Sequence, residues 1–214
     1  SIKSNLEYKI TGRHILRFSG AYISRPPTIR NSFSNSRENN NFVEGIGDEN
    51  IYSSEATYFM NLEPIKLKLT GYYSRFQNMN EISFFFAQGL SGLEESSDFV
   101  SEIMTGSSRD HYGIEFGVES KISSTLKASA GVALGEYVYT NNPNLYLTSD
   151  DIRGTADYGT TYIENYKVPG TPQRGYSLGL EYRNPNYWFI SANGNYLSNN
   201  YIDISHIIRT EKFY

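Results

Sequence analysis

The feature that most constrains this chain is a strict alternation of apolar and polar residues over positions 176–196. The apolar positions are Tyr176, Leu178, Leu180, Tyr182, Trp188, Ile190, Ala192, Gly194 and Tyr196, with one break at 184–186. Successive side chains of a β-strand point to opposite faces, so the pattern predicts two strands with one apolar and one polar face. Each run has about the ten-residue length of a strand that crosses an outer membrane. The pattern therefore favours a function exerted across a membrane.

Composition agrees with half-polar strands and excludes several other classes. The chain is 38% hydrophobic but 15% aromatic, with 19 Tyr and 12 Phe and a mean hydropathy of −0.50. Many aromatics at low hydropathy are expected of a barrel with tyrosine girdles. The longest apolar stretch, Phe84 to Ala87, is too short for a transmembrane helix. A net charge of −4 without a basic patch argues against nucleic acid as a partner, and the absence of Cys excludes disulfides and thiol chemistry.

The same alternation recurs along the chain and predicts eight strands in four hairpins. The expected pairs are 2–10 with 14–24, 53–62 with 65–76, 110–122 with 125–139, and 176–183 with 188–196. All seven prolines fall in the expected turns and loops, as they should because proline cannot donate to a strand ladder. The predicted fold class is all-β, an antiparallel transmembrane β-barrel.

The connections between these strands are sharply unequal in length. Turns within hairpins take two or three residues, whereas the links 25–52, 77–109 and 140–173 are long and polar and are expected to be loops without regular structure. Compact domains rarely contain three such loops. Outer-membrane barrels combine short periplasmic turns with long extracellular loops. We therefore expect the turns to be periplasmic and the long loops to be extracellular.

This topology places both ends of the chain on the outer side of the membrane. A complete single-chain barrel normally has both termini in the periplasm. We therefore expect residues 1–214 to form one partial barrel, with the remaining strands supplied by sequence outside them. Alternatively, the chain closes by itself as an eight-stranded adhesin or small pore.

Several segments resemble TonB-dependent outer-membrane receptors of the Bacteroidetes type. The stretch LRFSGAYISRPPTIRNSF at 16–33 resembles a barrel strand that ends in an Arg-x-Pro-Thr-Ile-Arg segment. Residues 65–78 are similar to a strand of the same family, and the strongest likeness is in GTPQRGYSLGLEYRNPNYWFISANGNYLSNNYIDIS within 170–209. The motif Leu-Lys-Pro-Glu, usual in the family before one strand, is degenerate at 47–56.

The resemblance implies a barrel of about 22 strands, of which this chain would supply about eight. It also implies an outer-membrane location, an N-terminal plug domain and import of an extracellular ligand energised by TonB through sequence outside this chain. A surface lipoprotein is a possible further partner of such a barrel. Neither a plug nor a TonB box lies in this sequence, and within the family the specificity for a ligand resides in loops and plug.

The alternation assigns candidate residues to each face. Leu178, Leu180, Ile190 and Ala192 are expected to face lipid. Candidates for contact with a ligand or a plug are Arg25, Arg30, Lys66, Lys68, Tyr72, Glu115 and Glu119, together with the loop aromatics Phe84, Phe85 and Phe86. Arg17 is expected to share the inner face, and Tyr158, Tyr162 and Tyr166 could extend the aromatic surface. The alternative is that the charges pair across any water-filled interior and that the aromatics fold over one another.

No residue pattern points to catalysis, a cofactor or a resident metal. His14, His111 and His206 share no ligand spacing, and the acidic groups Glu94, Glu95 and Asp98, or Asp150 and Asp151, lack the spacing of a calcium loop. The Gly-Leu-Ser-Gly at 89–92 is not a nucleophile elbow. The leading hypothesis is a transporter without covalent chemistry. The others are a receptor-like barrel subunit of a larger outer-membrane complex, the small barrel, and a β-sandwich lectin.

Overall fold

The computed structural model describes residues 1–37, 40–88, 97–149 and 155–202. One short 3-10 helix, η1 (Ile29–Asn31), accompanies the strands. The strands are β1 (Ile2–Thr11), β2 (His14–Arg25), β3 (Glu49–Leu62), β4 (Ile65–Gln88), β5 (Ser97–Lys121), β6 (Leu126–Tyr139), β7 (Asn144–Ser149), β8 (Ala156–Thr160), β9 (Arg174–Arg183) and β10 (Phe189–Ser198). Every pairing between them is antiparallel, so the all-β antiparallel class is confirmed.

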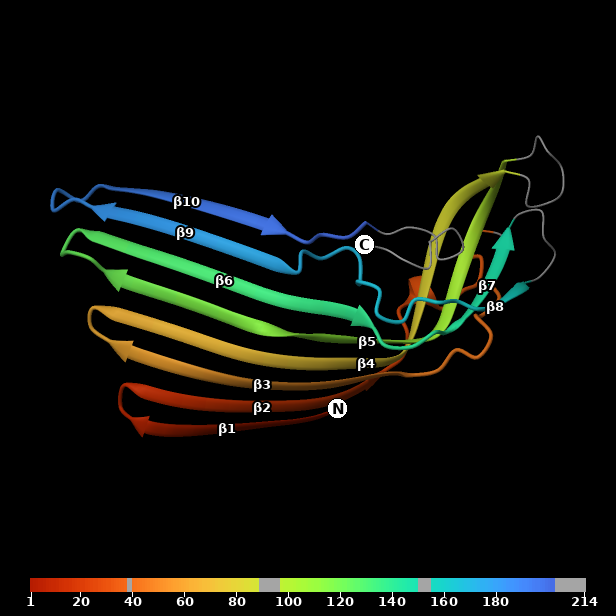
Figure 1. Ribbon diagram of the computed structural model, residues 1–214, viewed down its shortest axis with the longest axis horizontal. Coiled ribbons are helices and arrows are strands. Elements are labelled where there is room, and N and C mark those ends of the chain that lie inside the picture. The colour runs from red at the N-terminus through yellow and green to blue at the C-terminus, as the bar shows by residue number, and fades with distance from the viewer. Residues whose placement is uncertain (38–39, 89–96, 150–154, 203–214) are drawn as a thin grey trace.

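Eight strands follow one another across a single sheet in the order β1-β2-β3-β4-β5-β6-β9-β10. Four tight turns join them in pairs at one end, on the left in Figure 1. The four predicted hairpins are therefore confirmed. The described part of the sheet is not closed: β1 pairs only with β2, and β10 only with β9. No helix among the described residues is long and apolar enough to cross a membrane.

The segment 77–109, expected to be an irregular loop, instead continues β4 and β5 beyond the sheet as a two-stranded arm (Figure 1). Pairing in this arm runs from Glu81 opposite Met104 to Gln88 opposite Ser97. The expectation was wrong because the arm begins with Asn78, Asn80 and Glu81, and Asn and Glu are depleted in strands and common in loops.

A local irregularity separates the arm from the sheet. The register between β4 and β5 shifts on both sides of Met79, and Asn78 and Gly106 have positive φ angles of 57° and 70°. Extra residues in one strand bend it and increase its twist. Both strands accordingly turn upward at this point in Figure 1.

The segment 140–173, also expected to lack regular structure, contributes two further strands to the arm. β7 pairs with β5 from Val100 to Thr105, and β8 pairs with β7. The expectation of eight strands is thus corrected to ten. β7 is mostly buried, and its apolar residues Leu145 and Leu147 were too few to produce a visible alternation.

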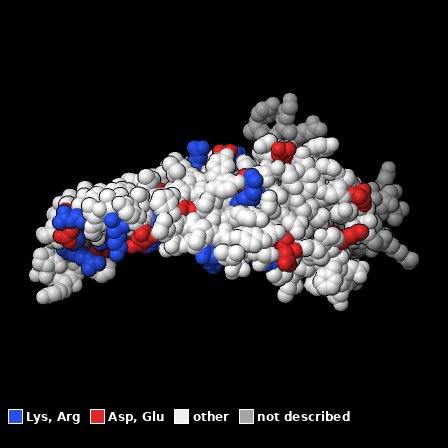
Figure 2. Space-filling model, turned by 90° about the horizontal axis from the view of Figure 1, so that it is seen from below, with Lys and Arg blue, Asp and Glu red and all other residues white. Residues whose placement is uncertain are grey.

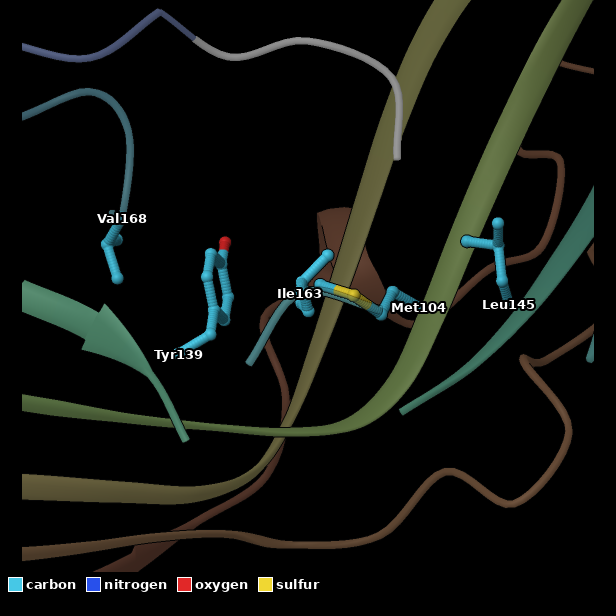
Figure 3. Packing of buried hydrophobic residues seen from close by; sticks show 5 residues of the cluster. All are labelled: Met104, Tyr139, Leu145, Ile163 and Val168. Carbon is cyan, nitrogen blue, oxygen red and sulfur yellow. The ribbon is translucent and has the colours of Figure 1, made fainter. Parts of the chain in front are cut away.

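The packed interior lies at this end of the molecule and not within the main sheet. One cluster joins Met104, Tyr139, Leu145, Ile163 and Val168, which come from β5, β6, β7 and the segment after β8 (Figure 3). A second cluster joins Val43 from the connection between β2 and β3 to Ile82 and Ile103 of the arm. These contacts explain why polar-looking segments adopt strands there, since burial of apolar side chains outweighs local propensity.

Candidate functional site

The main sheet is a single layer with two chemically different faces. On one face, called the apolar face, register aligns Leu16, Tyr58, Leu69, Phe116, Val132 and Tyr176 across six strands. The neighbouring residues of each strand form the polar face, where Arg17, Thr57, Thr70, Glu115 and Ala133 align. Leu69 and Phe116 remain exposed, so no described element covers the apolar face at this level.

The four candidate lipid-facing residues all lie on the apolar face. Leu180 is opposite Ala192, and Tyr182 is opposite Ile190, in the same register as Leu178 opposite Gly194. Leu178, Leu180 and Ile190 are 70%, 55% and 64% exposed. Large apolar groups so open to solvent normally mark a surface that another phase or molecule covers.

The apolar face has a defined height along the strands. Away from the turns it ends in the tyrosines Tyr22, Tyr52, Tyr73 and Tyr112, which lie in two adjacent rows on neighbouring strands. Beside the turns it ends in exposed Ile65 on β4 and Ile122 after β5. The band from Ile65 to Tyr73 and from Tyr112 to Ile122 matches the roughly 9–11 residues of a transmembrane strand.

An ion pair lies directly beyond Tyr73 and Tyr112 on the same face, in the row of Tyr22 and Tyr52. The Arg75 Nε and Nη2 atoms donate to the two carboxylate oxygens of Asp110 at 2.8 and 2.7 Å, and the Tyr73 hydroxyl donates to the same carboxylate at 2.9 Å. The Arg75 hydrogen bonds hold the pKa of Asp110 below its ordinary value, so the carboxylate is ionised at neutral pH. The change from apolar band to ion pair within two residues marks a sharp boundary.

The candidate charges of the polar face do lie together, as alternation predicted. Lys66 is opposite Glu119, and Lys127 of β6 reaches the same carboxylate at 2.8 Å. Lys68 follows on the same face of β4, opposite Gly117, and Glu115 is opposite Thr70. With Arg17, the lysines Lys66 and Lys68 and Glu119 line a shallow hollow between β2 and β6. Figure 2 shows charged groups gathered toward the turn end of the molecule.

Tyr72 has a packing role on the polar face that sequence alone did not indicate. Its hydroxyl lies 3.1 Å from that of Tyr137, two strands away. An added Cβ at Gly113 or Gly135, the residues between them, would approach the Tyr72 hydroxyl to 2.7 or 2.8 Å. The Tyr72 side chain therefore extends over the polar face of β5 and β6, where the absence of side chains at Gly113 and Gly135 leaves room for it.

Arg25 and Arg30 differ in their surroundings. The Arg25 Nε donates at 2.9 Å to Glu49, whose side chain is 1% exposed at the start of β3. Arg30 lies exposed in η1. Arg25 thus neutralises a buried carboxylate, whereas Arg30 is open to a ligand.

The aromatic candidates lie on strands of the arm and not in a loop, which corrects the expected placement of Phe84, Phe85 and Phe86. Phe84 and Phe86 contact Phe99 of β5, with ring centroids 5.5 and 5.1 Å apart. The Arg37 guanidinium lies 4.2 Å from the centroid of the same ring. Phe84 and Phe86 therefore pack against Phe99, with Phe86 exposed at the edge of this group, whereas Phe85 is opposite Val100.

The tyrosines Tyr158, Tyr162 and Tyr166 do not act as one surface. Tyr158 on β8 and Tyr162 are exposed, whereas Tyr166 packs against the cluster around Tyr139. Residues 89–95, 150, 151 and 206 lie outside the described residues, and so do the predictions that fall on them. Within the part that the structure describes, no three His, Asp or Glu side chains gather as metal ligands.

The two described histidines do not meet. His14 lies beside a turn, with Nδ1 2.7 Å from the Tyr58 hydroxyl. His111, one residue beyond the apolar band, lies between the rings of Phe76 and Tyr137 at 4.8 and 4.3 Å. Burial, with a smaller contribution from Arg109, lowers the pKa of His111 to about 4, so this ring is neutral at neutral pH. The neutral His111 ring therefore contributes aromatic packing between Phe76 and Tyr137.

Two features were missed by reasoning from the sequence. The Arg75–Asp110 pair joins residues 35 positions apart, and only strand register could have brought them together. In the turn between β9 and β10, Tyr187 was not singled out, and Trp188 was read only as an apolar position of the following strand. Comparison of the chain with family models, curated proteins and solved structures finds no match.

Proposed function

We propose that this chain is part of an outer-membrane β-barrel that works as a TonB-dependent receptor, importing an extracellular ligand through its lumen. The observation that carries the proposal is the single-layer sheet, whose apolar face is exposed over a membrane-wide band. In water such a surface promotes aggregation, whereas in a bilayer the apolar side chains contact lipid, as the outer face of a membrane barrel must.

The distribution of connections supports the same proposal. Four tight turns lie at one end of the sheet, and the arm with both hydrophobic clusters lies at the other (Figure 1). We assign the turn end to the periplasm and the packed end to the cell surface. The resemblance of 16–33, 65–78 and 170–209 to TonB-dependent receptors of the Bacteroidetes type supports the finer assignment.

In this proposal the polar face lines the lumen. Lys66, Lys68, Glu115 and Glu119 then contact the plug or the passing ligand, and the exposed Arg30 and Phe86 of the packed end contact the ligand outside. The partners are lipid, TonB through the plug domain, and a surface lipoprotein. No step in this function makes or breaks a covalent bond.

Adjacent residues on β10 test the membrane assignment. Ala192 lies on the apolar face and Ser191 on the polar face, opposite Glu181. Ala192→Arg should lower the free energy of unfolding in a bilayer by about 2–4 kcal/mol, as expected near the membrane midplane. Ser191→Arg, the matched control, should change it little because its charge enters the aqueous side. Equal effects of the two variants would contradict the assignment.

The transport assignment is tested separately in cells. Deletion of the gene should abolish accumulation of one class of external nutrient in a panel of labelled candidates. Deletion of TonB should abolish the same accumulation. Accumulation that survives deletion of the gene, or that persists in the TonB mutant, would contradict the transport assignment.

A further inference from the structure

The turn between β9 and β10 is unlike the other three hairpin turns of the sheet. It presents Tyr187, fully exposed at 102%, and Trp188, 51% exposed. The remaining turns present Gly12 and Arg13, Glu63 and Pro64, and Ser123 and Ser124. Trp188 is also the only tryptophan of the chain.

Hydrogen bonds hold this turn in one conformation. The Asn184 backbone N–H donates to the Trp188 carbonyl at 2.8 Å, and the Tyr187 N–H donates to the Asn184 carbonyl at 3.1 Å. The Asn186 N–H donates to the Asn184 side-chain oxygen at 2.9 Å. The two aromatic side chains are therefore exposed because the hydrogen-bonded turn holds the backbone in this conformation.

Tyr187 occupies a backbone conformation that suits another residue better. Its φ angle is +66°, in the left-handed region that Gly and Asn adopt readily and bulky residues adopt rarely. A fully exposed tyrosine gains no packing energy within this chain to offset that strain. A contact outside the chain would explain the choice of residue.

Trp188 continues the apolar face into the turn, beside the exposed Tyr187. The Trp188 ring packs on Tyr182, with centroids 5.5 Å apart, and the Asn184 side chain donates to the Tyr182 hydroxyl at 3.1 Å. Tyr182 is opposite Ile190, whose exposed side chain belongs to the apolar band. The neighbouring Phe189 is opposite Arg183 and belongs to the polar face, so it is not part of this patch.

We propose that Tyr187 and Trp188 anchor the β9–β10 turn in the headgroup layer of the bilayer on the turn side of the sheet. This inference rests on the proposed membrane function and adds a specific lipid contact to it. Tyr and Trp favour this layer because each has an apolar ring for the acyl boundary and a polar N–H or O–H for water and headgroups. At their turns, the hairpins that end in Ile65 and Ile122 present an apolar side chain without such a polar atom.

The test uses single cysteines carrying an environment-sensitive fluorophore in the complete protein, reconstituted in phosphatidylcholine vesicles. Labels at Tyr187, at Ser123 in the β5–β6 turn and at Leu180 in the apolar band are compared. We expect a nitroxide placed near the headgroup to quench the label at 187 several-fold more than the label at 123. Iodide in the water should show the opposite order, and the label at 180 should respond only to a deep nitroxide.

The three labels separate the possible failures. If the label at 187 is quenched by iodide as strongly as that at 123, while 180 remains in lipid, the anchor is wrong and the membrane assignment stands. If 187 is shielded from both quenchers, a protein covers the turn and the anchor is also wrong. If 180 itself is open to iodide, the membrane assignment fails and the anchor fails with it.

A single variant adds a test that does not depend on labels. Tyr187→Asn suits the positive φ and should leave the unfolding midpoint in detergent unchanged or raised. In vesicles the same variant should lose stability relative to the native protein. A change of the same sign and size in both media would overturn the anchor.

Discussion

Gly113 and Gly117 lie four residues apart on the polar face of β5, but an added methyl group meets different surroundings at each. At Gly113 a Cβ would lie 2.4 Å from the Leu134 carbonyl oxygen and 2.8 Å from Gly135 Cα, whereas nothing lies within 4 Å at Gly117. Gly113→Ala should therefore lower the free energy of unfolding by about 1–3 kcal/mol, since backbone atoms must move. Gly117→Ala should be neutral or stabilising by up to about 1 kcal/mol. Denaturant midpoints measured in one detergent compare the two variants. Equal losses of stability would contradict the interpretation that Gly113 is required because the backbones of β5 and β6 approach closely there.

Alternation alone was sufficient to place residues on faces. Lys66, Lys68 and Glu119 were assigned to one side because Leu67 and Val118 occupy the other, and register confirms this. The partners of these residues were not predictable, because a one-residue change of register exchanges every partner across the strands. The contact of Tyr72 with Tyr137 spans two strands and depends on glycine at positions that carry no sequence signal for it.

At the scale of elements, the bend in the β4–β5 hairpin should be sensitive to a single methyl group. Gly106 has a φ of +70° and its Cβ position is nearly open, so Gly106→Ala introduces backbone strain of about 1–2 kcal/mol without a clash. We expect faster hydrogen exchange in the arm at Ile82 and Ile103 and unchanged exchange in β9 and β10. Gly71→Ala in the sheet portion of β4, where nothing lies within 4 Å, is the control. Uniform acceleration along the chain would show that the bend is not an independent element.

The arm is also where prediction from the sequence failed, for a physical reason. Its strands begin in polar residues that favour loops, and what stabilises them is contact between Val43, Ile82 and Ile103. Such contacts join residues far apart in the chain, and no local window contains them. The four hairpins were predictable because each carries its own alternation and its own turn.

At the scale of the whole molecule, the unpaired edges of β1 and β10 make the barrel proposal testable. Unpaired backbone groups in hydrocarbon cost several kcal/mol each, so a membrane-embedded sheet must pair both edges. In the complete protein within vesicles we expect the outer amides of β1 and β10, around Leu6 and Asn193, to exchange as slowly as those of β3. Hydrogen exchange measured by mass spectrometry resolves the three segments. Rapid exchange confined to the edges would contradict a closed barrel.

In the proposed outer-membrane location, the bend in β4 and β5 divides each of these strands between lipid and water. Below it the strands rely on lipid against the apolar face, and above it they rely on the packed clusters around Met104 and Ile103. Cooperative unfolding requires that all parts of a chain respond together to the same perturbation. Denaturant acts directly on the packed end, whereas bilayer thickness and composition act on the sheet. On this proposal one continuous hairpin joins two stability domains, and any single melting temperature belongs to the protein together with the surrounding bilayer.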